Sequence, residues 1–131
     1  MRIEFKTERI EKEFGYKCLD KRLKTILYYI MGIIGTKFGY GHYMLLTDIF
    51  RSDKEDKIIY AGSIPNAGNI HGCWRAIDFV LKNNLGVNWN IKQCENIVEL
   101  INERIRYHKK ERYKTLIFHS VQKGDKGHFH L

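Results

Sequence analysis

Apolar residues recur at helical spacing in two segments of the chain, and this pattern predicts two amphipathic helices. The first helix is expected over residues 21–34, with Asp20 as its N-cap and Gly35 at its end. Its apolar positions are Leu23, Ile26, Leu27, Ile30, Ile33 and Ile34. The second is expected over residues 92–107. Its apolar positions are Cys94, Ile97, Val98, Ile101 and Ile105. A shorter, charged helix is expected over residues 7–14.

Other segments have the apolar and aromatic content of strands. They are residues 43–50, 75–80, 113–121 and 128–131. A turn over residues 122–127 separates the last two, which predicts an antiparallel hairpin. Helices mixed with antiparallel strands are typical of an α+β fold, here a small antiparallel sheet with flanking helices. No linker or repeat interrupts the pattern, so we expect one domain over residues 1–131, with residues 1–20 as an N-terminal extension.

The formal net charge of +8 on 131 residues favours a polyanionic partner: nucleic acid, an anionic cell-wall polymer or lipid headgroups. The basic residues are spread along the chain, and no ribonucleoprotein, helix-turn-helix or zinc-finger pattern occurs. Because of the charge, a basic nucleic-acid-binding module is the alternative function. The favoured prediction includes neither a nucleic-acid nor a membrane partner.

Cysteine usage and the N-terminal segment bear on the compartment. The three cysteines, Cys18, Cys73 and Cys94, form no CxxC pair, which favours reduced thiols. Residues 1–15 are charged throughout, unlike a signal peptide, and the apolar stretch at 25–35 is too short to span a bilayer. We expect a monomer that is made in the cytoplasm without a signal peptide.

Candidate metal ligands occur in two segments, HGCWRAIDF at 71–79 and GDKGHFHL at 124–131. Alternate residues of a strand share a face, so His128 and His130 point the same way. If their strand lies beside the one that holds Asp78, the carboxylate and one of these imidazoles converge, and His71 on the preceding loop can join them. Two imidazoles and a carboxylate suit Zn²⁺ with an open fourth position for water.

A carboxylate or histidine beside such a metal ion could carry the proton transfers that hydrolysis needs. Asp125, or whichever of His128 and His130 does not bind the metal, is the candidate for this role. His119, on the partner strand of the hairpin, could also face the site.

The same residues resemble a known family. His71-x6-Asp78 with Arg75-Ala76-Ile77 resembles the SxHxxGxAxD signature of M15-type zinc D-Ala-D-Ala carboxypeptidases, which share their fold with hedgehog amino-terminal domains. GHFHL resembles the second signature of the family, HxH or [DE]xxH at the end of a hairpin strand. MLLTDIFRS at 44–52 resembles the strand that leads into an Arg-Ser loop. The chain has Trp74 at the glycine of the first signature and Asn69 at its serine.

The resemblance implies a hedgehog/DD-peptidase-like fold with zinc held by His71, Asp78 and His130. It implies that Arg51 binds a substrate carboxylate and that Asp125 or His128 handles the proton. If the DxxH spacing applies instead, His128 is the ligand and Asp125 the general base.

The implied activity is zinc-dependent hydrolysis of a peptidoglycan stem-peptide bond next to a D-amino acid. A phage endolysin released by a holin, or a lysin carried in the virion, would reach the wall without a signal peptide. A relative that keeps the zinc but is catalytically inactive, as hedgehog domains are, is the further alternative.

Overall fold

The computed structural model describes residues 1–50, 74–107, 114–119 and 127–131. The elements, in chain order, are β1 (Arg2–Phe5), α1 (Glu8–Phe14), α2 (Lys21–Phe38), β2 (Tyr43–Asp48), β3 (Asp78–Lys82), α4 (Ile91–Arg104), β4 (Ile117–His119) and β5 (His128–His130). This mixture of helices and a mainly antiparallel sheet confirms the predicted α+β class. Within the described ranges, no helix combines the length and the hydrophobicity needed to cross a membrane.

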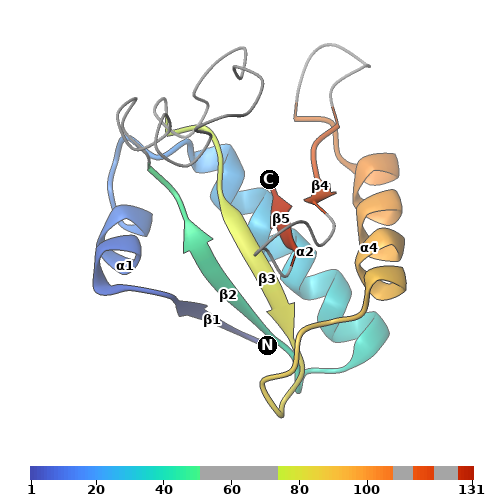
Figure 1. Cartoon of the computed structure of the whole chain (residues 1–131). Helices are drawn as coiled ribbons and strands as arrows, with labels where there is room; N and C mark the ends of the chain where they lie inside the picture. Colours follow the sequence, from blue (N-terminus) through green and yellow to red (C-terminus); the bar gives the residue numbers. More distant parts are fainter. Residues whose placement is uncertain (51–73, 108–113, 120–126) are drawn as a thin grey trace, which may run out of the picture.

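The strands form one five-stranded sheet in the order β1-β2-β3-β5-β4 (Figure 1). β1 runs parallel to β2, and the pairs β2–β3, β3–β5 and β4–β5 are antiparallel. β1 was not predicted, because residues 1–20 were expected to be an extension. The predicted hairpin of the last two strands is confirmed, although residues 122–126 of its turn lie outside the described residues.

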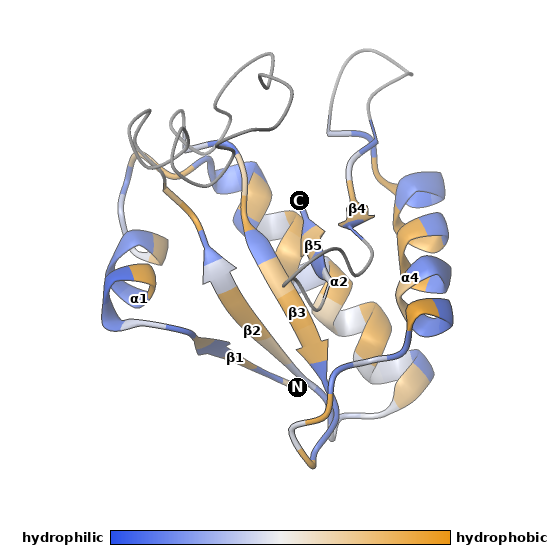
Figure 2. Cartoon of the chain, in the orientation of Figure 1, coloured by the Kyte–Doolittle hydropathy of each residue, from blue (hydrophilic) through white to orange (hydrophobic). Residues whose placement is uncertain are grey.

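One face of the sheet forms the core together with α2 and α4. The strand residues on this face are fully or almost fully buried: Met44, Leu46, Phe79, Leu81 and Phe129. The apolar sides of the two helices face this layer (Figure 2). The neighbouring strand positions alternate to the opposite face, and these positions include Asp78, His128 and His130.

The start of α2 was predicted correctly, but its end was not. The Asp20 carboxylate accepts a hydrogen bond of 2.9 Å from the backbone N–H of Arg22, as an N-cap does. The helix continues through Gly35 to Phe38 and ends at Gly39, whose φ is 92°. A Cβ at Gly35 would lie 2.6 Å from Cε1 of Tyr40. The glycine therefore leaves room for the Tyr40 ring to pack against the helix.

Asp20 also connects the start of α2 to the segment after α4. The Tyr107 hydroxyl donates to Oδ2 of Asp20 at 2.6 Å, and the Arg22 guanidinium donates to the same oxygen at 2.7 Å. The Arg22 hydrogen bond, assisted by the one from Tyr107, holds the pKa of Asp20 well below its usual range. Nε of Arg75, just before β3, lies 4.0 Å from this carboxylate.

Asp20→Asn should lower the melting temperature at pH 7, because it keeps an N-cap but removes the charge that Arg22 and Tyr107 stabilise. The folded-state pKa of Asp20 lies below the unfolded value, so this stability is present above about pH 4 and is lost as the pH falls further. Thermal unfolding measured from pH 7 to pH 3 should show the difference between the two melting temperatures becoming smaller. A difference that stays constant over this range would contradict the charge effect.

Gly127→Ala should destabilise the protein by about 2 kcal/mol, since its φ of 86° disfavours a side chain and a Cβ would lie 2.9 Å from the Phe118 ring. Gly32→Ala is the matched control, at an exposed position of α2 with nothing within 4 Å of the added Cβ. It should stabilise by up to about 1 kcal/mol. Urea unfolding of both variants measures the contrast, and equal effects would count against the turn geometry.

Candidate metal centre

The pairing of β3 with β5 places Asp78 directly opposite His130. The next pair in the register is Phe79 and Phe129, whose rings stack on the core face with centroids 4.9 Å apart and planes 9° apart. Asp78 and His130 therefore share the opposite face. This convergence was predicted on the condition that the two strands are neighbours, and the sheet order confirms that condition.

The Asp78 carboxylate interacts with both histidines of β5. Nδ1 of His130 lies 2.8 Å from Oδ1 of Asp78, at hydrogen-bonding distance. Nε2 of His128 lies 3.9 Å from Oδ2, which is an ion-pair distance if the imidazole is protonated. Asp78 is 6% exposed, and a carboxylate buried to this degree needs such partners.

The donor atoms of Asp78 and His130 fit a zinc ion. Two ligand atoms on a tetrahedral zinc lie roughly 3.3 Å apart, given zinc–ligand distances of about 2 Å. The observed distance between Nδ1 and Oδ1 is 2.8 Å, so a small separation of the two side chains would admit the ion. The imidazole nitrogen that faces the carboxylate is Nδ1, which identifies it as the candidate ligand atom.

Other predicted site residues lie outside the described residues: Arg51, His71 and Asp125. Among residues 1–50, 74–107, 114–119 and 127–131, no group of three or more His, Cys, Asp or Glu side chains is placed to hold a metal ion. Of the three predicted ligands, Asp78 and His130 lie in the described part of the chain and contact each other, whereas His71 lies outside it. Metal binding by all three stays a prediction.

Trp74 has a backbone conformation that normally favours glycine. Its φ is 57°, in the left-handed region, and it is the position at which the family signature has glycine. The indole stacks on Phe50, with centroids 4.6 Å apart and planes 15° apart, and its ring centre lies 5.7 Å from that of Tyr16. These ring contacts pack the indole against residues of two other segments, where the family signature has glycine.

His119 lies beside the two histidines of β5, as the hairpin suggested. It is paired with His128 in the β4–β5 register. Its ring centroid is 5.0 Å from that of His128 and 6.0 Å from that of His130. Three imidazoles and one buried carboxylate therefore gather on this face of the sheet.

A hollow of about 360 Å³ lies next to this cluster. Asp78 and His128 line it, together with Asp48 of β2 and the cationic side chains of Lys6 and Lys82. A volume of this order is typical of small-ligand sites. A small ligand bound there would lie next to the Asp78 carboxylate.

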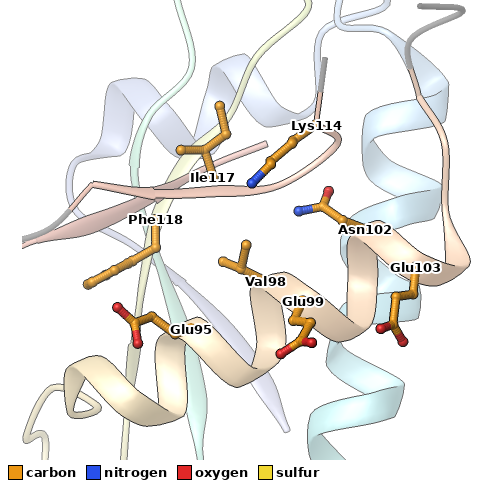
Figure 3. A pocket seen from close by; sticks show the side chains of 8 residues that line it. All are labelled: Glu95, Val98, Glu99, Asn102, Glu103, Lys114, Ile117 and Phe118. Atoms are coloured by element: carbon orange, nitrogen blue, oxygen red, sulfur yellow. The ribbon is translucent and has the colours of Figure 1, made fainter. Parts of the chain in front are cut away.

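A second hollow, of about 520 Å³, lies between α4 and β4 (Figure 3). Its lining residues are Glu95, Val98, Glu99, Asn102, Glu103, Lys114, Ile117 and Phe118. Asn102 has a structural role here, since its amide donates to the Leu116 carbonyl at 2.8 Å and accepts from the Leu116 N–H at 2.9 Å. Among the described residues, the lining contains no histidine or cysteine, so the histidine cluster is the better candidate for chemistry.

Comparison of the chain with protein-family models, with curated proteins and with solved structures gave no match. The resemblance to the zinc peptidases therefore stays a prediction that depends on the motif residues.

In the metal-free protein, His130 should carry its proton on Nδ1, because the ionised Asp78 carboxylate can only accept a hydrogen bond. Asp78→Ala removes this acceptor, and the proportion of the Nε2–H tautomer should rise. Nitrogen NMR of the imidazoles measures both tautomers. An Nε2–H tautomer of His130 in the unsubstituted protein would contradict the assignment.

Proposed function

We propose that this chain is a zinc-dependent peptidase that hydrolyses a stem-peptide bond of bacterial peptidoglycan next to a D-amino acid. The observation that carries the proposal is the Asp78–His130 pair, a buried carboxylate bonded to an imidazole at the positions where both motifs place metal ligands. The left-handed backbone at Trp74, where the family signature has glycine, supports the same reading.

Each candidate residue has a distinct role in this proposal. His71, Asp78 and His130 would hold the zinc ion. Bound zinc would polarise the scissile carbonyl and lower the pKa of a water molecule toward about 7. His128, whose Nε2 lies 3.9 Å from the Asp78 carboxylate, would take the proton of that water, and Asp125 is the other candidate for that step.

Substrate binding would depend on positive charge. Arg51 would hold a carboxylate of the stem peptide, a task for which the planar guanidinium is suited. The net charge of +8 would favour adsorption to an anionic cell wall. In its biological setting the protein would act as an endolysin released by a holin, or as a lysin carried in the virion.

Protein purified without chelator should contain about one zinc ion per chain, and Asp78→Ala and His130→Ala should both lose it, because each removes one ligand. His42→Gln is the control, since His42 accepts a hydrogen bond of 3.0 Å from the Trp89 indole and belongs to a different part of the fold. It should retain zinc. Metal analysis with circular dichroism checks binding and folding together. Zinc content indifferent to both ligand substitutions would refute the metal centre.

The zinc-loaded protein should release peptides from purified peptidoglycan, and removal of zinc by a chelator should abolish the release. His128→Gln should keep the zinc and lower kcat by roughly 10²- to 10⁴-fold, as loss of a proton-transfer group does. Mass spectrometry of the products identifies the bond. Stoichiometric zinc without release of wall peptides would instead identify a catalytically inactive relative.

A further inference from the structure

His119 of β4 and His128 of β5 form a second pair of potential metal ligands beside the Asp78–His130 pair. His119 and His128 stand directly opposite each other in the β4–β5 ladder. Their neighbours Phe118 and Phe129 meet on the core face, with centroids 5.0 Å apart, so the two imidazoles share the other face. His119 is exposed and His128 partly exposed, so both residues are in contact with solvent.

The separation of the two rings suits a shared metal ion. Two imidazoles bound to one tetrahedral ion have centroids roughly 5 Å apart, given metal–nitrogen distances of about 2 Å. The observed separation is 5.0 Å, and the planes are inclined at 39°. Neutral imidazole binds Zn²⁺, Ni²⁺ and Cu²⁺ readily, and water can fill the remaining positions on the ion.

We propose that His119 and His128 form a second, weaker site for a divalent transition-metal ion, distinct from the Asp78–His130 centre. Two imidazoles from adjacent strands are a smaller ligand set than the three expected at the first centre, so the second ion binds less tightly. An ion at this site occupies a nitrogen of His128. If His128 transfers a proton in the proposed peptidase, excess metal therefore inhibits the enzyme. This last consequence, unlike the binding itself, rests on the proposed function.

Ni²⁺ and Zn²⁺ titrations of the full chain, followed by calorimetry, test the binding. The unsubstituted protein should bind two ions in two steps of different affinity. His119→Ala should lose the weaker step and keep the stronger, whereas Asp78→Ala should do the reverse. His119→Gln provides a second variant in case the alanine variant does not fold, and His42→Gln is the histidine control. A single step in the unsubstituted protein, or a weaker step that survives both His119 substitutions, overturns the proposal.

Peptidoglycan hydrolysis provides an independent measure of the inhibition. The rate of hydrolysis with excess zinc is divided by the rate with one zinc equivalent per chain. This ratio should fall well below one in the unsubstituted protein and stay near one in His119→Ala. A ratio that falls equally in both overturns the link between the second ion and His128. Two-step binding without hydrolysis in any variant upholds the second site and counts against the proposed function alone.

Discussion

The antiparallel pairing of β3 with β5 is the constraint on which the rest of the site depends. The stacked rings of Phe79 and Phe129 fix its register from the core side. A slip of one residue would turn Asp78 or His130 into the core and place a phenylalanine on the opposite face. The apolar contact on one face of the sheet thus determines which polar side chains meet on the other.

Local sequence patterns predicted the elements whose signal lies within a single segment of the chain. The periodicity of α2 and α4 and the hairpin of β4 and β5 all follow from spacing within one segment. β1 was missed because a four-residue strand gives little signal, and its pairing with β2 joins segments separated by two helices. The end of α2 was misplaced because Gly35 fits the ring of Tyr40, a contact that a helix-stop rule does not consider.

The candidate site was predictable to a similar degree. Strand alternation placed His128 and His130 on one face, but the histidine that bonds to Asp78 follows only from the β3–β5 register. The left-handed backbone at Trp74 could not be predicted from the sequence, because tryptophan does not favour this conformation. The stacking of the indole on Phe50 depends on tertiary structure. The predicted hairpin already suggested that His119 lies near His128. The distance between their ring centroids follows only from the structure.

The central claim, that the Asp78–His130 pair forms part of a zinc centre, is tested most directly by X-ray absorption spectroscopy. The sample should contain no more than one zinc equivalent per chain, so that the tighter site alone is filled. The account predicts only nitrogen and oxygen ligands at about 2 Å, with the multiple scattering of imidazole, and a changed spectrum in Asp78→Ala. A sulfur shell near 2.3 Å, or a spectrum unaffected by the substitution, would place the zinc elsewhere and contradict the claim.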